Sequence, residues 1–309
     1  MAGAALSQEE LGQKLLAALA ALYAPSSSQA TRWAANEWLS NFRFTEEAWM
    51  ISHALLARGR TTTPGATADA DNTEALFFAA QTLHIKLRHD FDQLPPQSLP
   101  DLQKSIIDHV YRFSSGPRNV LTKLCLALAA FAVRTHSSEL WGASRDVVAT
   151  LVATFTKSGN PDHLICLLEL LHVLLAEADD DRLDVDRDVR RAFMHTVRSS
   201  AAHVLKFLSQ ALTQSGNNAK VHEGIFRCLA SWVFWGDISS STLMSAAPQL
   251  VSATFTALAA PHLFDVAVDA ALGHARGLLT DAQSSLTASM LRDLQQGHPI
   301  EADHVIGDM

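Results

Sequence analysis

Apolar residues recur at steps of three and four in segment after segment of this chain, and no convincing strand alternation appears. Such spacing places side chains on one face of a helix with 3.6 residues per turn. In the first segment the stripe consists of Leu11, Leu15, Leu19 and Leu22. The sequence therefore predicts an all-α protein.

Start and stop signals divide this pattern into about a dozen helices. Ser7 and Glu10 form a capping-box pair, in which each side chain can bind the other residue's free backbone N–H. Another helix is expected after Thr45, because Glu46 and Glu47 stand in its first turn, and acidic residues suit the positive end of a helix. The helical pattern resumes at Thr73, after an interruption, and continues until Pro95 and Pro96 stop it. Later helices are expected at about 98–112, 118–135, 140–157, 162–177, 189–212, 219–235, 241–258 and 261–276.

Two segments interrupt the helical pattern. Residues 59–73 are rich in turn formers and predict an exposed loop. Residues 177–188 carry seven acids and two arginines. This acidic segment is either a solvated linker or a docking site for a basic partner, with Asp179, Asp180 and Asp181 as candidate contacts.

Tandem helical hairpins of roughly forty residues match the period of HEAT and armadillo repeats. One hairpin cannot bury its apolar face alone, so neighbours stack and leave a long surface for partners. We expect a HEAT/armadillo-like α-solenoid, with a compact helical bundle as the alternative.

The composition excludes several classes of protein. With 24 basic and 32 acidic residues the net charge is −8, which argues against direct nucleic-acid binding by a basic face. Hydrophobic residues make up 48%, so the chain as a whole is not disordered. The longest apolar runs are half of the roughly twenty residues that a bilayer span needs. No secretory or transit signal opens the chain, so we expect cytosol or nucleus and no membrane contact.

Cysteine, histidine and tryptophan give no strong sign of chemistry. The three cysteines lie in apolar helices without metal-ligand spacing, so packing is favoured over a nucleophilic role. The 14 histidines form no His-x-x-x-His or His-Glu-x-x-His motif, so no metal or other cofactor is expected. The six tryptophans fit a helical core better than partner anchors. They are Trp33, Trp38, Trp49, Trp141, Trp232 and Trp235.

Three strings near the N-terminus resemble the start of the importin-β superfamily, and its transportin-SR group in particular. They are Arg32-Trp-Ala-Ala-Asn-Glu-Trp-Leu39, Glu47-Ala-Trp-Met-Ile-Ser-His-Ala-Leu-Leu56 and Phe77-Phe-Ala-Ala-Gln-Thr-Leu83. The resemblance covers about residues 6–276. It implies a HEAT solenoid that acts as a nuclear transport receptor in cytoplasm and nucleus. Its implied partners are the Ran GTPase in its GTP state, protein cargo and nuclear-pore repeats.

A second resemblance lies in residues 284–309. Ser284-Ser-Leu-Thr-Ala-Ser-Met-Leu-Arg-Asp293 and Gly297-His-Pro-Ile-Glu-Ala-Asp303 look like the C-terminal helices of 2-dehydropantoate 2-reductase (ketopantoate reductase). By position in those motifs, Ser289 would be the substrate-binding hydroxyl and Glu301 the active-site carboxylate. The expected domains are therefore a solenoid at 1–276 and a short helical tail at 277–309.

The reductase resemblance covers only the tail. A dinucleotide-binding fold needs G-x-G-x-x-G/A after a strand, and this chain has no such string. The family's lysine motif K-x-x-x-N is also missing, since Gly224 stands four residues after Lys220, the last lysine. The sequence favours a non-enzymatic transport receptor, with an NADPH-dependent reductase relative as the alternative.

Overall fold

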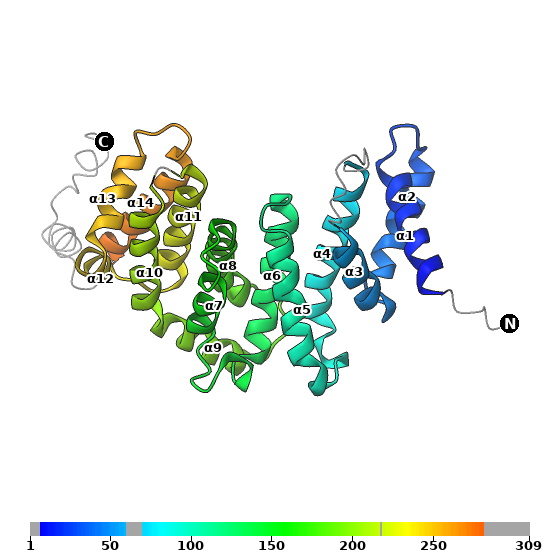
Figure 1. Ribbon diagram of the computed structural model, residues 1–309, viewed down its shortest axis with the longest axis horizontal. Helices are drawn as coiled ribbons and strands as arrows, with labels where there is room; N and C mark the ends of the chain where they lie inside the picture. The colour runs from blue at the N-terminus through cyan, green and yellow to red at the C-terminus, as the bar shows by residue number, and fades with distance from the viewer. Residues whose placement is uncertain (1–6, 60–69, 217, 281–309) are drawn as a thin grey trace, which may run out of the picture. The chain divides into compact units, whose positions relative to one another are not determined.

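A computed structural model describes residues 7–59, 70–216 and 218–280. All regular secondary structure in these residues is helical, with fourteen α-helices and three short 3-10 helices (Figure 1). The α-helices are α1 (Gln8–Tyr23), α2 (Gln29–Phe42), α3 (Glu47–Arg58), α4 (Ala70–His89), α5 (Leu99–Arg112), α6 (Arg118–Thr135), α7 (Val147–Thr156), α8 (Pro161–Asp179), α9 (Arg187–Ser199), α10 (Ala201–Gln214), α11 (Ala219–Trp235), α12 (Ser240–Ala246), α13 (Pro248–Ala257) and α14 (Phe264–Thr280). The 3-10 helices are η1 (Phe91–Gln93), η2 (Pro96–Ser98) and η3 (Glu139–Trp141).

Contacts between helices are made with near neighbours along the chain. In the N-terminal unit, residues 1–196, α1 packs on α2, α3 on α4, α4 on α6 and α6 on α8. In the C-terminal unit, residues 197–309, α10 packs on α11, and α11 and α13 both pack on α14. This stacking of successive hairpins confirms the predicted HEAT/armadillo-like α-solenoid. The predicted boundary between solenoid and tail at 276/277 stays a prediction.

The centre of the N-terminal unit is formed by α6 and α8. Leu124, Leu128 and Phe131 on α6 are fully buried, and so are Leu167 and Leu171 on α8. A helix that is apolar on most of its circumference must be covered on several sides. Here α6 lies between α4 and α8, which explains why the apolar residues of α6 are not confined to one stripe.

The first hairpin follows its sequence signals closely. The Ser7 backbone N–H donates to Glu10 Oε2 at 2.8 Å, and the Glu10 N–H donates to Ser7 Oγ at 3.3 Å, so the predicted capping box is present. Leu15 and Leu19 are buried against Leu39 and other residues of α2 to α4. Loss of such a cap costs about 1 kcal/mol, so local chemistry fixes where this chain first turns helical.

Helix boundaries match the prediction where caps are strong. Helices α6 and α11 occupy the expected residues 118–135 and 219–235. The helix expected at 140–157 is wrong in its first part, because α7 begins only at Val147. Gly142 and Arg145 have φ angles of 79° and 52°, which break a right-handed helix, and Asp146 then caps α7 through the N–H of Ala149.

Two expected long helices are each divided. The helix predicted at 189–212 breaks at Ser200, which has ψ near 2°, and gives α9 and α10. The helix predicted at 241–258 breaks at Ala247, which has φ −147° and ψ 53° before Pro248. Proline disfavours helical conformation in the preceding residue, so Ala247 ends α12 and Pro248 opens α13.

The region around α4 also departs from the prediction. Helix α4 begins at Ala70, ahead of the expected Thr73, and ends at His89, while η1 and η2 occupy the residues near the two prolines. Residues 60–69, most of the expected loop, lie outside the described residues. Helix α3 begins at Glu47, with Glu46 as its N-cap residue. Its first turn is of 3-10 type, because Ala48 and Trp49 donate their backbone N–H groups to the carbonyl oxygens of Thr45 and Glu46, three residues earlier.

Five of the six tryptophans are fully or partly buried, as predicted, and one is not. Trp141 and Trp232 are completely buried. Trp33 on α2 is 66% exposed, so its assignment to the core was wrong. A helical stripe predicts that a residue is buried only where a second helix covers the face on which that residue lies. None of the described helices is long and apolar enough to cross a membrane.

Candidate functional site

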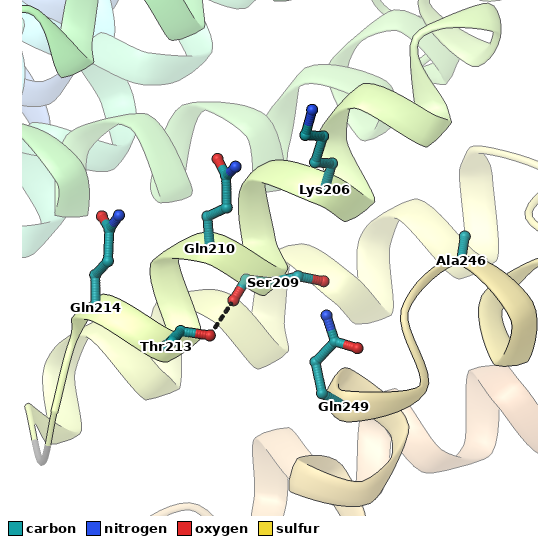
Figure 2. Close-up of a pocket in the computed structure, with 7 residues that line it drawn as sticks. All are labelled: Lys206, Ser209, Gln210, Thr213, Gln214, Ala246 and Gln249. Carbon is teal, nitrogen blue, oxygen red and sulfur yellow. Dashed lines mark hydrogen bonds between the residues drawn. The ribbon is translucent and has the colours of Figure 1, made fainter.

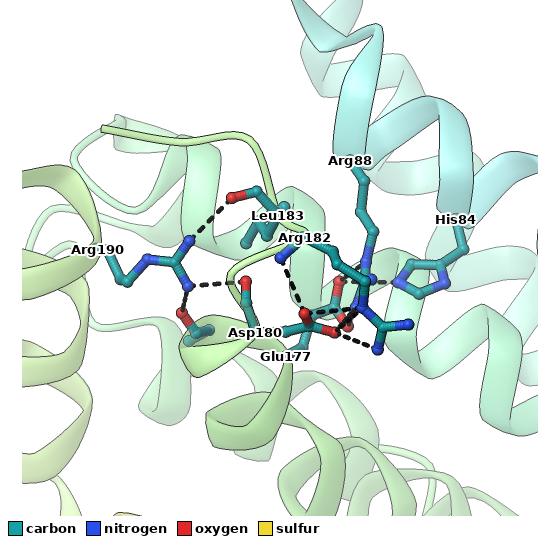
Figure 3. Close-up of polar contacts among 8 residues, drawn as sticks. His84, Arg88, Glu177, Asp180, Arg182, Leu183 and Arg190 are labelled. Atoms are coloured by element: carbon teal, nitrogen blue, oxygen red, sulfur yellow. Dashed lines mark hydrogen bonds and ion pairs between the residues drawn. The ribbon is translucent and has the colours of Figure 1, made fainter. Parts of the chain in front are cut away.

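Two places in the chain combine polar side chains in a defined geometry, and the first is the acidic segment (Figure 3). Glu177, near the end of α8, is only 2% exposed and accepts bonds from two residues of α4. His84 Nε2 lies 2.8 Å from Glu177 Oε1, and Arg88 Nε donates to the same oxygen at 2.7 Å. Arg88 Nη2 also pairs with Glu177 Oε2. Glu177, which the sequence places in a solvated segment, is therefore buried and links α8 to α4 through hydrogen bonds.

Charge in this cluster is balanced by arginine. Burial alone would raise the pKa of Glu177, but the bonds from His84 and Arg88 outweigh it and lower that pKa. Burial lowers the pKa of His84, against the influence of Glu177, so the imidazole is neutral at pH 7. Because an ionised carboxylate only accepts hydrogen bonds, His84 donates from Nε2.

Asp180 is bound from two sides. Arg182 Nε and Nη2 donate to Asp180 Oδ1 and Oδ2 at 3.0 and 2.8 Å, and Arg88 Nη2 donates to Oδ2 at 2.9 Å. The bond from Arg182 and then those from Arg88 lower the pKa of Asp180 far below its usual range. Its carboxylate is thus paired with two arginines of the same chain.

The link from α8 to α9 is held at both of its ends. Arg190 on α9 donates to the carbonyl oxygens of Ala178 and Asp180 at 2.7 and 2.8 Å, and to that of Leu183 at 2.9 Å. These bonds satisfy acceptors that the end of α8 leaves open. Across the link, the Asp184 N–H donates to the carbonyl oxygen of Arg88 at 3.3 Å. The acidic segment is consequently a bound strap rather than a loose linker.

The other two predicted contacts have a different environment. Asp179 ends α8, Asp181 follows in the turn, and both are exposed. Of the three candidates, these two present their carboxylates to solvent. The assignment of Asp179, Asp180 and Asp181 as contacts for a basic partner stays a prediction, and the structure shows that Asp180 already pairs with arginines of the chain.

One histidine pair stands out from the rest. His53 on α3 and His109 on α5 approach with Nδ1 and Nε2 3.0 Å apart, and Ser105 Oγ lies 3.1 Å from the same His53 nitrogen. Burial lowers the pKa of both imidazoles to about 4. Across the described residues, no group of three or more histidines, cysteines or acids is arranged to hold a metal ion.

The cysteines occupy the places expected of small apolar residues. Cys125, Cys166 and Cys228 are free thiols and are completely buried. Burial raises the pKa of Cys166 to about 12 and that of Cys125 well above the usual thiol value. A nucleophilic cysteine needs a lowered pKa, so the packing role is the one that the structure supports.

The second polar place is a groove in the C-terminal unit, with a volume of about 440 Å³ (Figure 2). One wall is α10, and the other is the end of α12 with the start of α13. We call it the α10 groove. Its lining residues are Lys206, Ser209, Gln210, Thr213, Gln214, Ala246 and Gln249.

Another groove, of about 520 Å³, lies between α1 and α3 in the N-terminal unit. Leu16, Ile51 and Leu55 supply its apolar lining, and Glu9 and Arg58 supply charge. Leu16, which is not part of the Leu11–Leu22 stripe, is 43% exposed.

The sequence analysis did not identify the α10 groove, and two of its candidate residues lie outside the described part of the chain. Lys206, Gln210 and Gln214 recur at four-residue steps, a signal that was available but that also marks any solvated helix face. Ser289 and Glu301, the candidates of the reductase reading, lie outside the described residues. Their roles stay a prediction.

Comparison with known proteins gives one family match. The model of the family described as exportin 1-like protein, Xpo1, matches residues 117–270. This region runs from the residue before α6 into α14 and so includes helices of both units.

The relatives found include importins and a transportin. The chain is 29% identical to transportin MOS14 of Arabidopsis thaliana over 235 residues, which is 76% of this chain and 22% of that protein. It is 28% identical to importin-13 of Bos taurus over 237 residues and to importin-13 of Homo sapiens over 241 residues, in each case 76% of this chain and 23% of the relative. The aligned part thus spans less than a quarter of these relatives. The matches support a relation to the importin-β superfamily.

Proposed function

From a helical stack that is similar to importins and a transportin over 76% of its length, we propose that this chain belongs to the importin-β superfamily and is part of a nuclear transport receptor. The observation that carries the proposal is this similarity, together with the exportin 1-like match over residues 117–270. We propose that the chain binds Ran in its GTP state and protein cargo, that it engages nuclear-pore repeats, and that it works in both cytoplasm and nucleus.

The mechanism is one of surface complementarity. Stacked helices offer several side-chain rows to a protein partner, and the protein does no covalent chemistry. If Ran binds one arrangement of the stack more tightly, it changes the affinity of the chain for cargo. Cargo then changes the affinity of the chain for Ran by the same factor. A chain with a net charge of −8 favours basic partner surfaces.

A direct test is capture of the chain on immobilised Ran. Ran loaded with a non-hydrolysable GTP analogue should retain the chain at least tenfold more than Ran loaded with GDP. Matrix without Ran serves as the background control. Equal retention by both nucleotide forms, or none by either, contradicts the proposal.

The reductase reading is not carried forward, since no described residue favours it. Ser289 and Glu301 lie outside the described part, and the described residues contain no strand on which a dinucleotide fold could be built.

A further inference from the structure

The α10 groove contains a regular row of polar side chains. Lys206, Gln210 and Gln214 stand four residues apart on α10, and Figure 2 shows them extending from the same side of that helix. Four residues of α-helix rise about 6 Å. Two residues of an extended chain advance about 6.6 Å, so successive groups in the row meet equivalent groups of an extended peptide.

The side chains of the row and of the opposite wall have no partner within the described residues. Lys206, Gln210, Gln214 and Gln249 make no hydrogen bond or ion pair there. Each glutamine offers one carbonyl acceptor and two N–H donors, the pair of functions that binds the N–H and C=O of a peptide unit. Three carboxamides around one groove are therefore suited to a main chain rather than to a particular side chain.

The hydroxyl groups of the groove complete this pattern. Ser209 Oγ donates to the carbonyl oxygen of Leu205 at 2.8 Å, and Thr213 Oγ1 donates to that of Ser209 at 3.0 Å. Because both hydroxyl protons are already used, these oxygens face a ligand as acceptors. Figure 2 shows Gln249 reaching from α13 toward Ser209.

We propose that the α10 groove binds an extended peptide segment of a protein partner through its main chain, with an acidic residue of that segment at the Lys206 end. The distance from Lys206 to Gln214, eight residues of helix, is about 12 Å and accommodates about four extended residues. Among the described residues that line the groove, Lys206 alone is charged, and it fixes the direction of the peptide by charge. The proposal goes beyond the transport function and does not depend on it.

The test uses a fluorescently labelled peptide of extended tendency, acetyl-Asp-Thr-Val-Thr-Val-Thr-amide, titrated with the whole chain in fluorescence anisotropy, without Ran or nucleotide. Three changes are compared. In the Gln210→Ala/Gln214→Ala variant the Kd should rise at least tenfold. In the Lys206→Ala variant the preference for this peptide over one that begins with Lys should disappear. N-methylation of alternate amides in the peptide should raise the Kd of the unchanged chain at least tenfold.

Lys220→Ala is the matched control, since Lys220 is an exposed lysine of the same unit outside the groove, and its Kd should stay within twofold. Both glutamines are exposed and alanine favours helix, so thermal unfolding of the double variant should match that of the unchanged chain. Absence of saturable binding, equal binding by the double variant, or equal binding of the N-methylated peptide overturns the proposal. The peptide-binding test contains no Ran, so neither outcome of the Ran capture test changes its result.

Discussion

The imidazoles of His53 and His109 meet nitrogen to nitrogen at 3.0 Å across the contact between α3 and α5. One of the two facing nitrogens must carry a proton and the other must be bare for this hydrogen bond to form. A second proton would set two N–H groups against each other. The geometry therefore excludes protonation of both rings at once, and burial disfavours the charge of even one protonated ring.

Acid should destabilise the protein through this pair. Burial lowers both pKa values from about 6.5 to about 4 in the folded chain, so the unfolded chain binds more protons between these values. Their contribution is fully present above pH 6.5 and is lost as the pH falls toward 4. Each of the two histidines adds at most about 1.4 kcal/mol per pH unit to the slope of the unfolding free energy.

The His109→Leu variant isolates this contribution. Urea unfolding between pH 6.5 and 4 should give a slope that is smaller, by at most about 1.4 kcal/mol per pH unit, than that of the unchanged chain. The His203→Leu variant, which removes an exposed histidine on α10, is the control and should keep the original slope. Identical slopes for all three proteins would show that the histidine pair does not resist protonation.

Removal of Arg88 should be far more costly than removal of Arg182. Arg88→Ala leaves the buried Glu177 without its strongest partner, which costs about 3–5 kcal/mol. The side chain of Arg182 is 79% exposed, so Arg182→Ala should cost less than about 1 kcal/mol. Equilibrium unfolding in urea at pH 7 measures both. The double variant Arg88→Met/Glu177→Leu should recover most of the loss, and failure to recover it would show that Arg88 matters mainly for other contacts.

Two glycine substitutions should act in opposite directions. Gly142 has φ 79° and ψ 178°, a conformation reserved almost entirely for glycine, so Gly142→Ala should lower the stability by about 1–3 kcal/mol. Gly12 lies inside α1, and an added Cβ would meet nothing within 4 Å. Gly12→Ala should raise the stability by about 0.5–1 kcal/mol. Thermal unfolding of both variants checks the signs, and a stabilising Gly142→Ala would refute the assignment of its backbone angles.

The exposed acids of the strap should affect Ran binding without affecting stability. Asp179→Asn/Asp181→Asn should slow association with GTP-loaded Ran by about two- to tenfold at low salt, with less effect at high salt. Stopped-flow fluorescence at two salt concentrations measures this. Asp265→Asn/Asp269→Asn removes the same charge from exposed positions on α14 and is the control. Equal slowing by both pairs would mean that the strap offers no specific contact.

Local signals were sufficient for the fold class and for many helix ends. The Ser7 cap, Asn160 before Pro161, and Gly236 after α11 act within a few residues, so the sequence itself shows where helices begin and end. The stack of helices follows from their apolar faces, which are a property of periodicity alone.

Most of the remaining features depend on residues distant in the sequence. In the sequence Glu177 is one of many acids, and its burial depends on His84 and Arg88, which lie 93 and 89 residues away. The break before α7 is local but was missed, because it combines Gly142 with a left-handed angle at Arg145, a residue type that gives no turn signal. The α10 groove needs Gln249 opposite Ser209 and Thr213, an arrangement that arises only when α13 packs beside α10.

The three buried thiols give the chain a built-in set of labels. Cys125 and Cys166 belong to the N-terminal unit and Cys228 to the C-terminal unit. A small alkylating reagent modifies each thiol only when its surroundings open, so mass spectrometry of the labelled peptides reports the opening free energy of each unit separately. Any partner that holds one unit shut leaves its mark on those thiols alone, without an added probe.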